Sequence, residues 1–206
     1  MLIKLSDIVT KYNLKINGVL HIGAHYGQEY SEYVKQGISN MIFFEPVKNN
    51  YKRLLVVLPK NENIKTFNVA LGNEIGEKEM FIETANHGMS CSLLEPGVHL
   101  SQYPHITFDT KEVVKIDRLD NIDFDRQKYN MMNIDVQGYE LEVFKGSEKT
   151  LKTIDIVYCE INFEEVYKGC ALSDEVDKFL KKFGFIRILT DKSNRTWGDA
   201  LYLKYQ

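Results

Sequence analysis

A short, mostly apolar segment that enters a turn of small residues restricts the fold of this chain more than any other feature. The segment covers residues 18–22, and the turn Gly-Ala-His-Tyr-Gly follows it at residues 23–27. A second apolar segment, residues 41–44, ends in Glu45. A strand, a glycine-containing turn, a helix and a second strand that ends in a carboxylate form the first half of a Rossmann-type nucleotide-binding unit. The chain is therefore predicted to bind a cofactor that contains adenosine.

The middle of this turn distinguishes between cofactors. A dinucleotide site has the pattern G-x-G-x-x-G, so that the backbone approaches a pyrophosphate without side chains. Here His25 and Tyr26 would obstruct that approach. S-adenosylmethionine (SAM) has no phosphate, so it is favoured over NAD. Gly23, Ala24 and Gly27 are predicted to form the cofactor turn; the alternative is an ordinary turn that needs positive φ.

The carboxylate after the second apolar segment is predicted to bind the cofactor's ribose. Glu45 follows the turn by roughly 20 positions, where an acidic residue accepts hydrogen bonds from ribose hydroxyls. The alternative is a carboxylate at a helix N-terminus, stabilised by the helix dipole, with Pro46 at the first helical position.

Two histidines flank the turn, but their spacing does not indicate a metal site. His21 and His25 lie at a strand end and in a turn, and the pattern H-E-x-x-H is absent. No metal is therefore expected. His21 is predicted to hydrogen-bond the turn, and His25 to contact the cofactor or to act as a base.

The hydrophobic pattern predicts an α/β fold: a Rossmann-like three-layer α/β/α sandwich. Nearly continuous apolar strands with helices between them indicate a mostly parallel sheet buried on both faces. The last two strands, joined by a short turn, predict an antiparallel terminal strand. Helices are expected within 1–15 and at 29–36, 48–58, 138–144 and 174–183, and strands at 18–22, 40–44, 64–69, 77–83, 111–116, 129–134, 154–161, 185–189 and 200–205.

Length and composition exclude several classes of protein. The 206 residues are predicted to form a single domain, 1–206. With 26 basic and 29 acidic residues, no nucleic-acid partner is expected, and no apolar segment is long enough to span a membrane. Three cysteines, an odd number without C-x-x-C spacing, indicate reduced thiols and a cytoplasmic protein.

Residues 84–111 lack a regular pattern and are predicted to form an insertion that acts as a lid or binds the acceptor. Ser90 in this insertion is expected to line the substrate cleft, with an ordinary surface loop as the alternative. Trp197, the only tryptophan, is predicted either to stack on a sugar ring or simply to pack.

Two carboxylates near the ends of later strands are candidates for catalysis. Asp135 follows a predicted strand, at the edge where open α/β sheets hold ligands, and is predicted to position the acceptor or remove its proton. The alternative is a helix cap. Glu160 lies in an apolar segment, where an unpaired carboxylate is costly, so it needs a partner, water or the site itself.

Four segments together resemble the FkbM-type methyltransferases, a class I SAM-dependent family. VLHIGAHYGQE resembles that family's cofactor turn V-D-V-G-A-N-x-G, and FFEPVKNNYKRL resembles its second-strand signature. NVALGNEIGE resembles the third-strand block, and MNIDVQGYELEVFKGSEKTL resembles the block I-D-V-E-G-x-E-x-x-V-L-x-G-A. The four blocks keep their order and spacing over residues 18–160.

This resemblance implies a SAM pocket and a reaction. It places Val69 and Ala70 in the pocket with Gly23, Ala24, Gly27 and Glu45, and Asp135 at the reaction centre. The family mostly methylates hydroxyls, often on sugars or natural products. The chain is therefore predicted to be a SAM-dependent O-methyltransferase that acts on a hydroxyl of a sugar, glycan precursor or small metabolite.

Three positions depart from the family pattern. His21 replaces an aspartate, His25 an asparagine and Gln137 a glutamate. Imidazoles can replace the first two hydrogen-bonding groups but make cofactor affinity sensitive to pH. Gln137 removes a charge, although a structural hydrogen bond would survive the change. The alternative function is therefore a methyltransferase-like binding module without catalytic activity.

Overall fold

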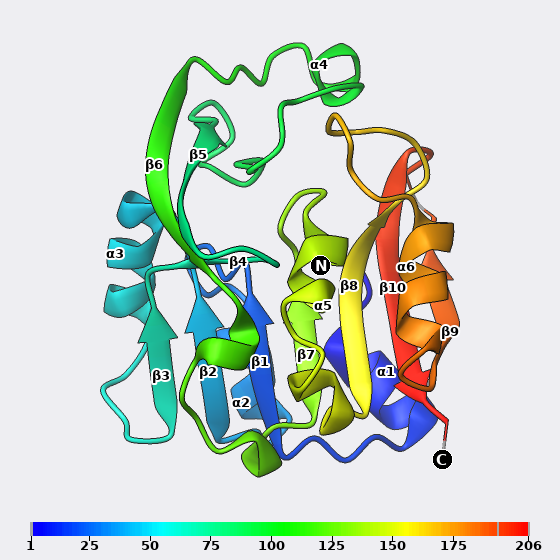
Figure 1. The fold of residues 1–206 in the computed structure, drawn as a ribbon. Coiled ribbons are helices and arrows are strands. Elements are labelled where there is room, and N and C mark those ends of the chain that lie inside the picture. Colours follow the sequence, from blue (N-terminus) through cyan, green and yellow to red (C-terminus); the bar gives the residue numbers. More distant parts are fainter. Residues whose placement is uncertain (1, 193, 206) are drawn as a thin grey trace.

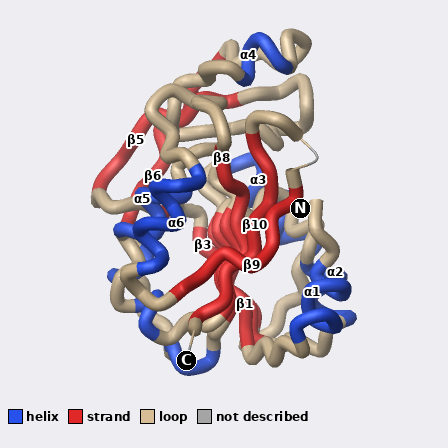
Figure 2. Tube along the Cα trace, turned by 90° about the vertical axis from the view of Figure 1, so that its right-hand side faces the viewer, coloured by secondary structure: helices blue, strands red, loops and turns tan. Residues whose placement is uncertain are grey.

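The main sheet of the protein has the predicted Rossmann-like arrangement. The structure is a computed structural model and describes residues 2–192 and 194–205. Within these residues seven strands form one sheet in the order β3-β2-β1-β7-β8-β10-β9 (Figure 1). Figure 2 shows the strands of this sheet in red, with helices on either side. The strands are β1 (Gly18–Ile22), β2 (Asn40–Phe44), β3 (Ile64–Phe67), β7 (Met131–Ile134), β8 (Ile156–Asn162), β9 (Phe185–Asp191) and β10 (Trp197–Lys204).

The antiparallel strand lies inside the sheet and not at its edge. β1, β2, β3, β7 and β8 pair in parallel, whereas β10 pairs antiparallel with both β8 and β9. A short connection between β9 and β10 permits only an antiparallel pair, because a parallel pair needs a long crossover. The predicted antiparallel terminal strand is thus confirmed, and it separates β9 from the parallel strands.

Helices cover both faces of this sheet. α1 (Leu5–Tyr12), α2 (Tyr30–Lys35) and α3 (Lys48–Val57) contribute buried residues to the core on one face. α5 (Glu140–Lys145) and α6 (Ser173–Lys181) pack on the other. Leu20 belongs to one core and its neighbour Val19 to the other, because successive side chains of a strand point to opposite faces. The predicted three-layer sandwich is confirmed.

A small second sheet stands at the carboxyl edge of the main one. β4 (Ala70–Leu71), β5 (Gly76–Ile82) and β6 (Thr110–Asp117) form it in the order β4-β6-β5 (Figure 1). The strands predicted near 77–83 and 111–116 exist, but they pair with each other instead of extending the main sheet. Short 3-10 helices follow at η1 (Leu119–Asn121), η2 (Arg126–Lys128) and η3 (Thr150–Lys152).

Residues 83–109, here called the cap, connect β5 to β6 and contain α4 (His99–Gln102). In Figure 1 the cap lies beside the loop that follows β8. Backbone N–H groups of Gly97 and His99 donate to the Val166 carbonyl at 2.9 and 3.1 Å. The Gln102 amide donates to the Thr196 hydroxyl at 2.6 Å. The cap is therefore held by segments far away in sequence.

None of the helices in the described part of the chain is long and apolar enough to cross a membrane. The three cysteines Cys91, Cys159 and Cys170 are free thiols and are buried.

Candidate active site

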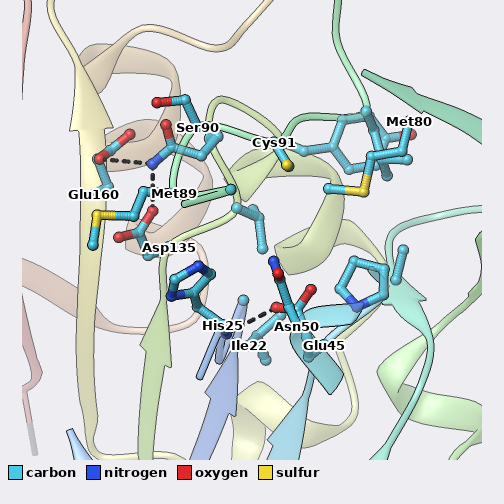
Figure 3. A pocket seen from close by; sticks show the side chains of 18 of the residues that line it. Ile22, His25, Glu45, Asn50, Met80, Met89, Ser90, Cys91, Asp135 and Glu160 are labelled. Atoms are coloured by element: carbon cyan, nitrogen blue, oxygen red, sulfur yellow. Dashed lines mark hydrogen bonds between the residues drawn. The ribbon is translucent and has the colours of Figure 1, made fainter. Parts of the chain in front are cut away.

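A cavity of about 690 Å³ lies at the carboxyl edge of the main sheet, beneath the cap. Open α/β sheets bind ligands at this edge. Figure 3 shows Asp135 and Glu160 on one side of the cavity and Glu45 and Asn50 on the other. Most of the site residues that were predicted from the sequence line this cavity: His21, Gly23, His25, Glu45, Val69, Ala70, Ser90, Asp135, Glu160 and Trp197.

Gly23 allows the turn after β1 to approach the end of β7. Its φ is +81°, and a Cβ atom built there would lie 1.8 Å from the carbonyl oxygen of Asp135. Any side chain would therefore force the two strand ends apart. At Gly23 the cavity is therefore lined by backbone without a side chain.

Two nominated residues of the turn do not line the cavity. Ala24 is buried in the core on the face of the sheet that α1, α2 and α3 cover. Gly27 has φ +76°, and a Cβ there would lie 2.7 Å from the Leu54 side chain of α3. In this structure these small residues serve the close packing of the turn against its helices.

Glu45 is held with its carboxylate at the cavity wall. One oxygen accepts the backbone N–H of His25 at 2.8 Å and the other accepts that of Val47 at 2.9 Å. Burial raises the pKa of Glu45 to about 7, and hydrogen bonds to Val47, His25 and Asn50 oppose this shift. A carboxylate offers about four acceptor positions, so Glu45 keeps about one free position for a ribose hydroxyl.

His21 is part of a buried network behind the cavity. Its Nδ1 lies 3.2 Å from the Tyr33 hydroxyl, which accepts a hydrogen bond from the Asn133 amide at 2.6 Å. The Glu29 carboxylate lies 3.9 Å from Nε2. Burial lowers the pKa of His21 despite that carboxylate. At neutral pH the ring is therefore an uncharged hydrogen-bonding group.

His25 connects the cofactor turn to the cap. Its Nε2 lies 2.9 Å from the His87 carbonyl oxygen, and its Nδ1 lies 2.6 Å from the Gln28 amide nitrogen. The carbonyl only accepts and the amide nitrogen only donates, so the proton belongs on Nε2. Its ring also stacks on Tyr26 at 3.6 Å. With both nitrogens in hydrogen bonds, His25 has no free position to act as a base.

Asp135 and Glu160 are joined by Gln137. Its amide nitrogen donates to Asp135 at 2.7 Å and lies 3.2 Å from Glu160, as the dashed lines in Figure 3 show. Its amide oxygen accepts the Tyr167 hydroxyl at 2.7 Å. Gln137 has φ +55°, so its backbone is held in the left-handed region. The neutral amide thus joins the buried carboxyl of Glu160 to the half-buried carboxyl of Asp135.

The protonation of this pair follows from burial. Burial raises the pKa of Asp135 to about 6, against the hydrogen bond from Gln137. Burial also raises the pKa of Glu160 well above its usual range, and repulsion from Asp135 and Glu140 adds to the shift. Of the two carboxyls, Glu160 therefore holds a proton more strongly, and Asp135 ionises more readily.

Several cavity residues did not emerge from the sequence. Asp199 lies opposite Glu160 in the pairing of β10 with β8 and accepts a short hydrogen bond from Tyr158. Its position in an apolar strand resembles that of Glu160 and was an available signal. His99 and Tyr103 of the cap also line the cavity, but no local pattern marked them.

The cavity fits SAM. Gly23 provides a wall without a side chain, Glu45 faces the cavity with fixed acceptors, and the acidic wall suits a sulfonium cation. Residues 2–192 and 194–205 contain no group of three or more His, Cys, Asp or Glu side chains that could hold a metal ion. Fold and site together define a Rossmann-like domain of the SAM-dependent methyltransferase class.

Comparison with known families makes this assignment specific. The chain belongs to the FkbM methyltransferase family, because the model of the methyltransferase FkbM domain matches residues 21–187. SAM is the cofactor, as the sequence of the turn predicted. The chain is similar to the 2-O-methyltransferase NoeI of Sinorhizobium fredii (strain NBRC 101917 / NGR234), with 25% identity over 159 residues. That match covers 73% of this chain and 65% of NoeI, so the chain spans less than two thirds of its relative.

Solved structures share the fold at low sequence identity. Sp1610 of Streptococcus pneumoniae, solved in complex with SAM, has a TM-score of 0.56 at 12% identity, over 100% of this chain and 74% of that one. The magnesium protoporphyrin IX methyltransferase ChlM of Synechocystis PCC 6803, with bound SAM, has a TM-score of 0.54 at 10% identity, over 97% and 76%.

Proposed function

We propose that this protein is a SAM-dependent O-methyltransferase that acts on a hydroxyl of a sugar, glycan precursor or related small metabolite. The observation that carries the proposal is Asp135, a half-buried carboxylate on the cavity wall whose pKa of about 6 suits proton removal near neutral pH. The similarity to NoeI, a 2-O-methyltransferase, supports oxygen as the methylated atom.

Each residue of the site has a separate task. Bound SAM supplies an electrophilic methyl group. Glu45 holds a ribose hydroxyl, and Asp135 accepts the proton as the acceptor oxygen becomes a nucleophile. Gln137 keeps Asp135 in one orientation by a 2.7 Å hydrogen bond. Alignment of donor and acceptor is itself a large part of the rate enhancement.

Among the three candidate bases, Asp135 fits the task best. Both ring nitrogens of His25 are already in hydrogen bonds. Glu160 holds its proton more strongly than Asp135, because burial and repulsion from Asp135 and Glu140 raise its pKa well above its usual range. Asp135 is left as the group on the cavity wall that ionises more readily.

A labelled-methyl assay tests this proposal. The protein is incubated with methyl-labelled SAM and a panel of sugars, glycosides and small alcohols, and products are analysed by mass spectrometry and NMR. We expect one acceptor class to gain a methyl group on oxygen. SAM binding without transfer to any acceptor would favour the binding module, and transfer to nitrogen or carbon would contradict O-methylation.

A further inference from the structure

The charged groups that line the cavity are of one sign. No lysine or arginine is present among the described residues that line it. Glu29 precedes α2, Glu45 and Asp135 follow β2 and β7, and Glu160 and Asp199 lie on β8 and β10. An acidic, partly dehydrated wall attracts a sulfonium cation and disfavours any phosphate or carboxylate on a second ligand.

His99 of the cap lines this cavity and carries an unsatisfied polar atom. The residue is 4% exposed, and its Nδ1 has no hydrogen-bond partner in the structure. Its ring is fixed between Tyr103, Phe108 and Tyr167, with centroids 5.1 to 5.5 Å away. A buried polar atom without a partner is costly, so a partner is expected. His99 is also one of the residues that line the cavity.

Tyr103 offers a second hydrogen-bonding group nearby. Its hydroxyl oxygen accepts the Asn194 amide at 2.6 Å and the Trp197 indole N–H at 3.2 Å. Both contacts use the oxygen as acceptor, so the hydroxyl proton remains available for donation. The same contacts hold the indole of Trp197 at the cavity wall.

The register of β10 connects the aromatic region under the cap, formed by His99, Tyr103 and Trp197, to the carboxylates. Trp197 and Asp199 are two residues apart on one strand and therefore share a face of the sheet. Asp199 lies opposite Glu160 on β8, and Glu160 is joined to Asp135 through Gln137. The aromatic region under the cap and the proposed base thus belong to one continuous wall.

We infer that the half of the cavity under the cap binds an uncharged, polyhydroxylated ring, held by His99 and Tyr103 and packed on Trp197. A neutral sugar matches this wall, because its hydroxyls both donate and accept hydrogen bonds and its C–H face packs on an indole. A uronic acid or sugar phosphate places its charge against the carboxylates. This inference rests on the proposed function but concerns binding, which is measurable without methyl transfer.

Trp197 allows direct measurement, because it is the only tryptophan of the chain. Its fluorescence is followed while the protein, saturated with S-adenosylhomocysteine, is titrated with methyl glucoside, methyl galactoside and methyl mannoside. Each is paired with the matching methyl uronide, which differs only in its carboxylate. We expect saturable binding of at least one neutral glycoside and at least 10-fold weaker binding of its uronide.

Variants assign the binding to the named residues. His99→Ala is expected to weaken glycoside binding at least 10-fold, and Tyr103→Phe to weaken it less. His87→Asn is the matched control, since His87 is in the cap but outside the cavity lining, and asparagine tolerates its φ of +59°. Unchanged affinity for S-adenosylhomocysteine, measured by calorimetry, shows that each variant is folded. If His99→Ala does not fold, His99→Gln replaces it with the same expected direction.

The outcomes separate this inference from the proposed function. Binding of a uronide as tightly as its neutral partner, no glycoside binding at all, or equal binding by His99→Ala and His87→Asn would overturn the inference. Methylation of an anionic acceptor would leave O-methyl transfer standing and refute the neutral subsite. Glycoside binding that depends on His99, without any methyl transfer, would support the subsite and refute the catalytic proposal.

Discussion

The site depends on a few buried polar residues whose neighbours set their chemistry. Asp135 and Glu160 are both enclosed, and Gln137 gives each an amide hydrogen instead of a further negative charge. A glutamate at position 137 would place a third carboxylate beside the pair, and all three could not ionise together without a cation. The amide therefore lets Asp135 ionise at a lower pH than a glutamate would allow.

Replacing Asp135 tests the base directly. Asp135→Asn is expected to slow methyl transfer by roughly 10²-fold or more while S-adenosylhomocysteine affinity stays largely intact, because an amide cannot accept the proton. Single-turnover assays with the acceptor found by the labelled-methyl panel measure the rate. Asp123→Asn, an exposed position, is the control. Turnover equal to that of the control would remove Asp135 from this role.

Replacing Glu45 tests the ribose contact. Glu45→Ala is expected to weaken S-adenosylhomocysteine binding at least about 10-fold, because each hydrogen bond to a charged group contributes about 1.5–3 kcal/mol. Glu45→Gln keeps the shape and should weaken binding less. Calorimetry measures both variants, with the exposed Glu62→Ala as control. An unchanged dissociation constant for Glu45→Ala would show that the ribose is held elsewhere.

At the scale of secondary-structure elements, the cap is positioned by contacts with two distant segments. At Gly97 the backbone of the cap lies against the backbone of the loop after β8. A Cβ atom at this position would lie 2.7 Å from the Glu165 carbonyl oxygen and 3.2 Å from that of Val166. Backbone atoms cannot move aside as a flexible side chain can. Only glycine therefore lets the cap settle on the loop after β8.

Gly97→Ala is expected to loosen the cap without unfolding the domain. Because the cap forms the wall proposed for the acceptor, KM for the acceptor should rise several-fold while S-adenosylhomocysteine affinity changes little. Hydrogen exchange in residues 83–109 should become faster. Ser101→Ala, on α4 but exposed, is the control. Unchanged exchange in the cap would contradict the contact's importance.

At the scale of the whole molecule, the free energy of unfolding is expected to decrease as pH rises, because buried carboxyl groups lose their protons. Burial raises the pKa of Glu45 and Glu140 to about 7, and that of Glu160 well above its usual range. These groups bind more protons in the folded chain than in the unfolded one, so stability decreases as they ionise. His21 and His99, whose pKa values burial lowers, act oppositely, but only below about pH 6.5.

The window between about pH 6.5 and 8 therefore isolates the carboxylates. The free energy of unfolding without ligand should fall across it, by at most about 1.4 kcal/mol per pH unit for each group that is protonated in the folded chain and ionised in the unfolded one. Urea unfolding at intervals of half a pH unit measures this fall. Glu140→Gln should show a shallower slope, whereas the exposed Glu62→Gln should match the natural chain. A stability that rises with pH in this window would refute the assigned protonation.

The sequence by itself determined the fold, the family and the candidate cofactor turn. These depend on local patterns: apolar strands that end in small or acidic residues, with helices between them. Glu45 and Asp135 were visible because they directly follow predicted strands, and the parallel arrangement places such ends at one edge.

Only the tertiary structure decided the contacts of Gln137, His25, His99 and the cap. Tyr167 and Gln137 are 30 residues apart, and Gln102 and Thr196 are 94 apart, so no local pattern reveals either contact. The unsatisfied nitrogen of His99 likewise results from what packs around it. Hydrogen bonds and burial depend on which distant side chains meet, and that is settled when the layers pack together.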